Sequence, residues 1–212
     1  MTPSPASPRT SLTSRTTAAF TAFTLFTIPR QRTECGGIDW YARELGWPVR
    51  AEPPELVTGT HFDALRLPAA AGLPLLARTR HAGPALRAGS DVWLLIAEGA
   101  AAEVPGLLQW LEWGTLATEL GLRAVGAGGR VPAPVPGAPY PREAAWVRPP
   151  LPGREGERAL PALGIGGRGE APDLVRLVGA AATECHRALL RRTHAAAGAA
   201  TAFAADQPLA FS

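Results

Sequence analysis

The chain has 212 residues, which is enough for one domain or for one domain with tails. Apolar residues make up 46% of it, so it can form a packed core and is not wholly disordered. All 21 basic residues are arginine, yet the net charge is only +3 and no arginine cluster exceeds the pair Arg191–Arg192, so charge alone is weak support for a nucleic-acid partner.

The N-terminal residues 1–33 form a Ser/Thr/Pro-rich stretch that we predict to be a disordered extension. Its segment 18–26, AAFTAFTLF, resembles the apolar part of a signal peptide, but threonines interrupt it and no cleavage site follows. No stretch approaches the roughly 18 apolar residues of a membrane helix. Cys35 and Cys185 are too few for a disulfide framework, so we predict a cytoplasmic protein without a membrane partner.

Periodicity and turn residues predict one ordered domain over residues 34–194, followed by an Ala-rich tail over 195–212. The expected elements are a helix at 38–45, two strands around Gly59 within 56–67, a helix at 69–80, a strand at 91–99, a helix at 100–114, two extended pieces within 121–137, an edge strand at 144–150 and a helix at 173–194. This order indicates an α+β domain with a mixed, mostly antiparallel sheet flanked by helices.

Three of these elements carry specific expectations. The run DVWLLIAEG (91–99) is continuously apolar, as a central strand buried on both faces would be. Trp110 and Trp113 lie three apart in the helix 100–114, and packing against the sheet is favoured over base stacking. The helix 173–194 is amphipathic, and its expected polar face holds Arg176, Glu184, Arg187 and Arg191.

The usual catalytic motifs are missing from the sequence. GAGG (126–129) lacks the spacing of a dinucleotide-binding loop, and Cys185 and His186 diverge because neighbours on a helix point about 100° apart. No cysteine–histidine spacing indicates zinc. Asp63, Asp91 and Glu98 are scattered rather than paired, so no metal site is expected.

Arg66 stands in FDALRLPAAAG (62–72), at the end of an expected strand. Strand ends that lead into such turns often hold the acids of metal-dependent enzymes. A cation there repels Mg²⁺, and it attracts a phosphate or a nearby carboxylate such as Asp63. The sequence therefore raises the question of an active site that has lost its acids.

Several segments, in order, resemble the bifunctional primase–polymerase N-terminal domain of the archaeo-eukaryotic primase superfamily. The similar segments are WYARELGWPV (40–49), LVTGTHFDALRLPAAAG (56–72), GSDVWLLIAEG (89–99), GLRAVGAGGRVPAPVPG (121–137) and AAWVRPP (144–150). The sequence is still more similar to small actinobacterial-type proteins with LEWG and DLVRLVGAAATECHR, which are described only as primase–polymerase-like or uncharacterised. The resemblance implies an RRM-like core.

The chain departs from the family pattern where the chemistry would lie. The resemblance implies metal acids near Arg66 and Pro68, a phosphate-binding histidine near Val92 and a third acid near Gly121. With all of these replaced, we expect a protein without catalysis and without a cofactor; Mg²⁺ or Mn²⁺ would be needed only if it were active.

Three functions stay open at this point. A non-catalytic protein would bind single-stranded DNA, a nucleotide or a replication protein, with Arg66, Arg123, Arg130 and His61 as binding residues. An active nucleotidyltransferase, a DNA primase/polymerase, would instead use Asp63, Asp91 and Glu98 in displaced positions. A protein-interaction or regulatory module would present the helices 103–114 and 173–194 to a partner.

Overall fold

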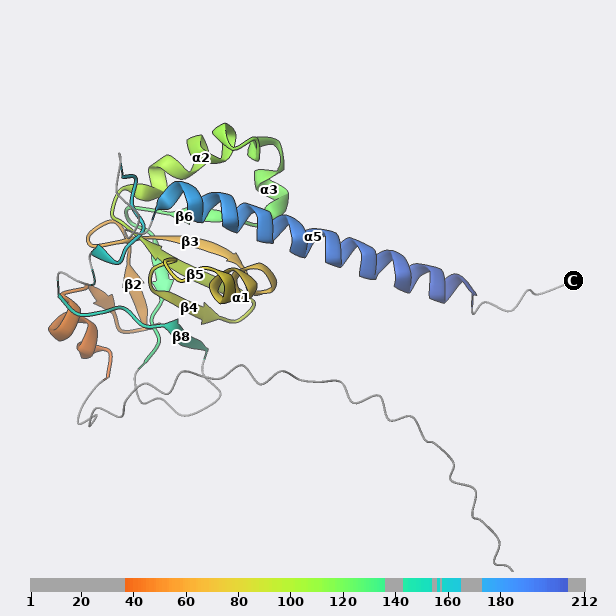
Figure 1. Ribbon diagram of the computed structural model, residues 1–212. Coiled ribbons are helices and arrows are strands. Elements are labelled where there is room, and N and C mark those ends of the chain that lie inside the picture. The colour runs from red at the N-terminus through yellow and green to blue at the C-terminus, as the bar shows by residue number, and fades with distance from the viewer. Residues whose placement is uncertain (1–36, 136–142, 154–155, 157, 165–172, 206–212) are drawn as a thin grey trace, which may run out of the picture. The chain divides into compact units, whose positions relative to one another are not determined.

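The chain is an α+β protein built on two antiparallel sheets (Figure 1). The structure is a computed structural model that describes residues 37–135, 143–153, 156, 158–164 and 173–205, with side chains up to residue 197. The predicted extension 1–33, Cys35 and the end of the predicted tail, 206–212, lie outside the described residues.

The larger sheet has five strands in the order β6-β3-β5-β4-β8. Its strands are β3 (Asp63–Pro68), β4 (Ala85–Ala88), β5 (Asp91–Ile96), β6 (Arg123–Val125) and β8 (Ala144–Arg148). Helix α1 (Ala69–Arg78) connects β3 to β4, and α2 (Ala100–Trp110) lies between β5 and β6. This connection order, with β5 inserted between β3 and β4, is the split βαβ topology. The predicted central strand and the predicted edge strand are confirmed as β5 and β8.

The smaller sheet contains β1 (Val49–Arg50), β2 (Glu55–Val57) and β7 (Arg130–Pro132), in the order β1-β2-β7. The predicted strands on either side of Gly59 exist, but β2 and β3 belong to different sheets. The same holds for β6 and β7, which flank the glycine turn. The two turns meet, since Thr58 Oγ1 donates to the Gly126 carbonyl at 2.5 Å. At each of these glycine turns, the chain therefore leaves one sheet and enters the other.

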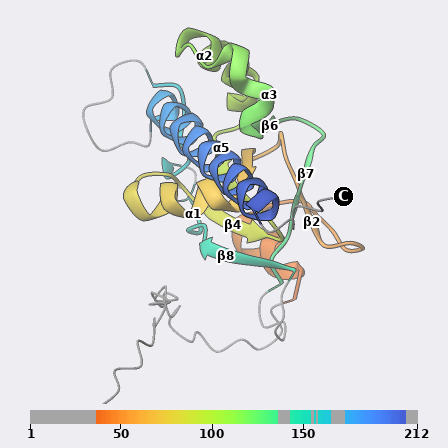
Figure 2. The same ribbon diagram turned by 90° about the vertical axis from the view of Figure 1, so that its right-hand side faces the viewer.

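Two apolar cores lie on opposite faces of the five-stranded sheet. Alternate strand residues such as Leu65, Val92 and Leu94 pack against α1, α2 and α5 (Leu174–Ala205). The other face is partly covered by the small sheet and by η1 (Tyr41–Leu45), the short helix predicted at 38–45. Figure 2 shows α5 running along the helical side of the sheet.

Helix α1 contains Pro74, which has no amide hydrogen to donate to the carbonyl of Ala70 one turn earlier. Arg191 of α5 replaces this missing donor, because its guanidinium donates to the Ala70 carbonyl at 3.2 Å. At the other end of α1, Arg148 of β8 donates to the carbonyls of Leu76 and Thr79 at 3.4 and 3.2 Å. Partial burial lowers the pKa of Arg148. Two arginines from distant segments thus satisfy carbonyls that α1 leaves open.

Asp173 directly precedes helix α5, and its Oδ1 accepts the amide of Val175 at 2.8 Å. Its first half buries an apolar face that includes Cys185, as predicted, but Glu184 is buried too, in contrast to the predicted polar face. Glu184 accepts hydrogen bonds from Arg78 and Arg187, and these cations explain how the acid can leave water. The helix also continues well past 194, where we predicted its end, and extends beyond the sheet (Figure 1).

Helix α2 ends at Trp110, earlier than the predicted residue 114, and is followed by η2 (Gly114–Leu116) and α3 (Ala117–Leu120). Glu112 has a φ of 64°, a left-handed conformation that turns the chain out of the helix. Trp110 is 73% exposed, so its predicted packing against the sheet is wrong. Trp113 instead packs edge-on against His186 of α5, with ring centroids 5.6 Å apart.

Within the described residues, none of the helices combines the length and the apolar character that crossing a membrane requires.

Candidate nucleic-acid interface

The face of the five-stranded sheet that points away from the helices forms a candidate binding surface. Because side chains alternate along a strand, Arg66 and Pro68 of β3 share this face with Asp91 and Trp93 of β5. The register places Arg66 opposite both Trp93 on β5 and Arg123 on β6. We call the three side chains of Arg123, Arg66 and Trp93, which lie side by side across three strands, the cross-strand row.

Only part of this face is open. The neighbouring positions Ala64, Leu86 and Leu95 are buried in the core beneath η1 and the small sheet. Tyr41 of η1 closes this covered part, since its hydroxyl donates to the Pro134 carbonyl at 2.6 Å and accepts from Trp146 Nε1 at 3.0 Å. Trp93 packs against the edge of this covered core, and Arg66 and Asp91 lie beside it. All three are half-buried, so β5 is not buried on both faces as predicted.

The side chain of Arg66 is held in place by the carboxylate of Asp91 and the ring of Trp93. Its Nε and Nη2 both donate to Asp91 Oδ2, at 3.0 and 2.6 Å, and its guanidinium carbon lies 5.6 Å from the centre of the Trp93 ring. The partner carboxylate is therefore Asp91, not Asp63 as we expected from proximity in sequence. Since a guanidinium has five N–H donors and two are used here, three remain for an oxyanion.

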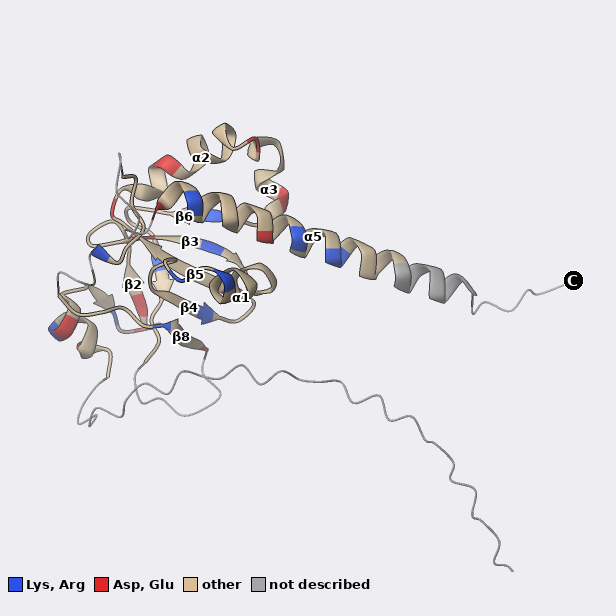
Figure 3. Cartoon of the chain, viewed as in Figure 1, with Lys and Arg blue, Asp and Glu red and all other residues tan. Residues whose placement is uncertain are grey.

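Arg123 adds a second cation beside the first. It is exposed, directly opposite Arg66 in the β3–β6 ladder, and forms no ion pair within the described part of the chain. Like charges placed opposite each other in a sheet repel, and Asp91 offsets only one of the two. Figure 3 shows the basic positions of β3 and β6 on adjacent strands. The open face therefore carries a net positive charge next to an indole ring.

The other predicted binding residues lie elsewhere. Arg130 belongs to β7 in the small sheet, where its Nη1 is 3.4 Å from Glu55 Oε2. His61 is exposed in the turn between β2 and β3. Of the four predicted residues, only Arg66 and Arg123 are placed side by side by the sheet register.

The three acids considered for catalysis do not converge. Asp63 pairs with Ile96 at one end of the β3–β5 ladder, and Asp91 pairs with Pro68 at the other. These ends are five residues apart, or about 17 Å at the usual rise of a strand. Asp63 and Glu98 line one cavity, whereas Asp91 lies against Arg66. Within the described residues, no three acids, histidines or cysteines group as metal ligands.

The positions where the resemblance implies acids do lie close together. Arg66 and Pro68 point to the same face of β3, and a Cβ built at Gly121 would be 3.3 Å from Pro68 Cγ. The position implied for the histidine, Val92, points to the helical face instead, and its neighbour Asp91 occupies the open face. The cluster thus holds a cation, a proline and a glycine, together with one carboxylate paired to the cation.

Sequence reasoning missed Trp93 and the role of Asp91. The period of two in Asp91-x-Trp93 would have placed both on the face of Arg66, but only if β3 and β5 were known to be neighbours. Comparisons of the chain with protein-family models, with curated proteins and with solved structures each find no match.

Proposed function

We propose that this chain is a non-catalytic protein of the primase–polymerase type that binds single-stranded DNA on the open face of its five-stranded sheet. The observation that supports it most directly is the cross-strand row, in which Arg66 adjoins the half-buried Trp93 indole and Arg123 follows on the next strand. Proteins that bind single strands without sequence preference combine cations for the phosphates with aromatic rings on which bases stack. Both parts are present here on one surface.

The topology supports the primase–polymerase part of the proposal. The split βαβ order agrees with the RRM-like core that the resemblance implies. In RRM domains the central strands of the sheet stack bases on their aromatic side chains, and Trp93 is on the central strand β5. Fold likeness alone does not establish function, so the proposal depends on the side chains of the row.

The loss of catalysis is supported by electrostatics. A divalent cation at the implied acid cluster would meet the guanidinium of Arg66, and the single nearby acid already forms an ion pair with it. Two-metal phosphoryl transfer needs acids that bridge ions roughly 4 Å apart, whereas Asp63 and Asp91 lie about 17 Å from each other. Nucleotide incorporation by the purified protein with Mg²⁺ or Mn²⁺ would contradict this part of the proposal.

Alanine substitutions in the row test DNA binding through its dependence on salt. For single strands, the logarithm of the affinity falls with the logarithm of salt concentration with a slope of roughly −0.7 per phosphate contact. We expect a slope of about −1.4 for the unaltered protein and about −0.7 for Arg66→Ala or Arg123→Ala. The measurement is fluorescence anisotropy with a labelled oligo-dT between about 50 and 200 mM salt.

Arg87→Ala is the matched control, because Arg87 is an exposed arginine of β4 that points to the helical side of the same sheet. Its slope should equal that of the unaltered protein. Trp93→Leu should weaken binding by about ten-fold without changing the slope, since it removes stacking and no charge. Equal slopes for all the arginine variants, or no binding at low salt, would rule out this surface.

Replacing Asp91 by asparagine should strengthen DNA binding. Asp91 holds Arg66 through two hydrogen bonds to one oxygen and adds a negative charge to the face. A phosphate must compete with this carboxylate, and the ion pair is weak enough to exchange because both side chains are partly exposed. We expect affinity for oligo-dT to rise about 3- to 10-fold at low salt. An unchanged or lower affinity would show that Arg66 does not contact the strand.

A protein partner is the second candidate function, and one observation favours it. Trp110 is 73% exposed at the end of α2 and forms no aromatic contact within the described part of the chain. Exposed tryptophans are frequent anchors of protein interfaces. A partner that is retained after nuclease treatment and lost in Trp110→Ser would support this candidate, provided that oligo-dT binding of the variant is unchanged.

A further inference from the structure

We infer that the cavity at the start of α2, on the helical side of the sheet, is a binding site for a hard divalent cation such as Mg²⁺ or Ca²⁺. The cavity has a volume of about 390 Å³ and is lined by two acids, Asp63 and Glu98, and by glycine and alanine residues. This inference does not rest on the proposed DNA binding, because Asp63 and Arg66 point to opposite faces of β3.

Asp63 is the central group of this site. It is 1% exposed, and its Oδ2 accepts the amide of Ala101 in the first turn of α2 at 3.0 Å. Its Oδ1 is also shielded from solvent, yet it has no hydrogen-bond partner within the described residues. A buried carboxylate oxygen without a donor is costly, so a cation in the adjoining cavity would supply the missing partner.

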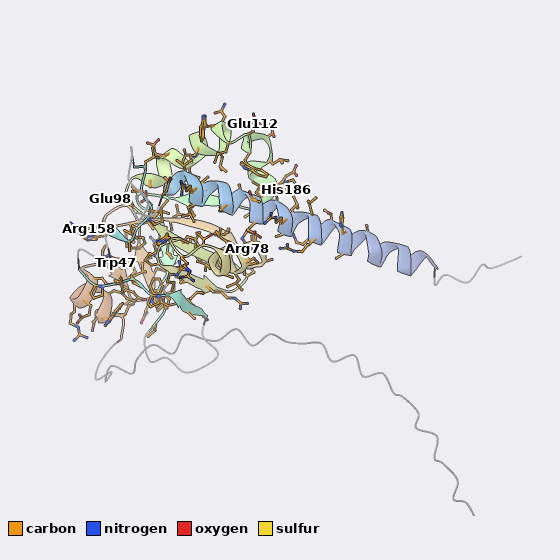
Figure 4. The ribbon with its side chains drawn as sticks, in the orientation of Figure 1. Trp47, Arg78, Glu98, Glu112, Arg158 and His186 are labelled. Atoms are coloured by element: carbon orange, nitrogen blue, oxygen red, sulfur yellow. The ribbon has the colours of Figure 1, made fainter. Side chains whose placement is uncertain are left out.

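The cavity adjoins this carboxylate, since Asp63, Ala101 and Gly126 all line it. Gly126 has no side chain to fill the space: a Cβ built there would contact both Asp63 oxygens, at 3.8 and 3.9 Å, and would be 3.2 Å from Ala101 Cβ. Glu98 directly precedes Gly99, the N-cap residue of α2, and its exposed side chain is labelled in Figure 4. The site therefore offers one fixed carboxylate and one adaptable carboxylate at its mouth.

The charge of the cavity selects a cation over an anion. The N-terminus of a helix attracts anions with roughly half a unit charge. Here, however, Asp63 already takes the Ala101 amide, and no arginine or histidine is among the described residues that line the cavity. The negative charge of the two carboxylates exceeds the partial positive charge of the helix N-terminus. A phosphate would be repelled, whereas a small cation would be held.

The ligand set favours a hard divalent ion that keeps part of its water shell. Carboxylate oxygens are the preferred ligands of Mg²⁺ and Ca²⁺, and Mg²⁺ commonly binds through one or two carboxylates with waters in its other positions. Zinc is disfavoured, since the cavity presents no histidine or cysteine among its described lining residues. With two acids, the affinity should be modest, with a Kd on the order of 1 mM.

The test uses the chelator-treated full-length chain without DNA. Calorimetric titration with CaCl₂ and with MgCl₂ should give a millimolar Kd for at least one ion. About 10 mM of that ion should raise Tm by about 3–6 °C above NaCl of equal ionic strength. Asp63→Asn should weaken binding by about ten-fold or more and abolish the Tm shift, because it keeps the size of the side chain but loses its charge.

Glu98→Gln tests the same site without touching the cap of α2 and should weaken binding about 3- to 10-fold, so the inference stays testable if Asp63→Asn does not fold. Glu119→Gln is the control, an exposed acid of α3 outside the cavity, and should bind the ion as the unaltered chain does. The inference is overturned if NaCl gives the same Tm shift, if neither ion binds, or if the Asp63 and Glu98 variants keep full affinity.

Discussion

Gly72→Ala is expected to lower the free energy of unfolding by about 2 kcal/mol, because α1 lies against β5 at this residue. A Cβ at Gly72 would be 2.5 Å from Val92 Cβ and under 3 Å from both of its methyl carbons, at 2.8 and 2.9 Å. Carbon atoms pack at about 3.5–4.0 Å, so the helix must move away from the sheet. Val92 is stiff and fully buried, and it has no room to yield.

Gly106→Ala supplies the matched control with the opposite sign. Gly106 is an exposed glycine within α2, and a Cβ there would meet no atom within 4 Å. Alanine restricts the unfolded chain and favours the helix, so the variant should gain roughly 0.5–1 kcal/mol. Urea denaturation of both variants measures the difference, which we expect to be about 3 kcal/mol. Equal stabilities would mean that α1 does not approach β5 so closely.

Much of the fold could be predicted from local patterns. The apolar run that became β5, the Gly46 stop after η1 and the strand leading to Pro68 are each determined within about ten residues. The sheet partners were not predictable in the same way. Segments on either side of Gly59 read as a hairpin, but a turn sequence does not state whether its two strands pair with each other or join different sheets.

The misassigned residues have physical reasons as well. Glu184 was placed on the polar face of its helix because acids are rarely buried without partners. Arg78 and Arg187 provide those partners, and Arg78 is 106 residues away from Glu184 in the sequence. Trp110 was expected to pack because tryptophan usually does, yet the helix ends there and leaves the indole in solvent.

In the candidate site, too, one residue could be identified from the local sequence and its partner could not. Arg66 could be singled out from the sequence, since a cation is unusual where the resemblance implies an acid. Its partner could not, because Asp91 is 25 residues away and is brought to it by the β3–β5 register. Sequence proximity pointed to Asp63, which the alternation of the strand directs to the opposite face. Cross-strand geometry, more than composition, decides which charges meet.

Alkaline pH is expected to destabilise the fold by about 4 kcal/mol between pH 8 and pH 11, through two buried groups. Burial raises the pKa of the Cys185 thiol to about 12, with the charge of Glu184 acting in the same direction and that of Arg192 opposing it. Burial likewise raises the pKa of the Tyr41 hydroxyl, partly offset by the hydrogen bond from Trp146. Both groups are neutral in the folded protein over this range.

The sign follows from which state holds the protons. In the unfolded chain the thiol titrates near 9 and the phenol near 10, whereas the folded chain keeps both protons up to higher pH. Above these values the unfolded state binds fewer protons, so stability falls by up to about 1.4 kcal/mol per pH unit for each group. The stabilisation is complete below pH 9 and is lost as pH rises toward the folded pKa values.

Two variants separate the contributions. Cys185→Ala should remove the part of the pH dependence that begins near 9, and Tyr41→Phe the part that begins near 10. Each variant will be less stable than the unaltered chain at pH 8, so the informative quantity is the slope of stability against pH. Urea denaturation with a reducing agent present, from pH 8 to pH 11, gives these slopes. If Cys185→Ala keeps the dependence of stability on pH that the unaltered chain has, the thiol is not buried between α5 and the sheet. The described packing of that helix on the sheet would then be incorrect.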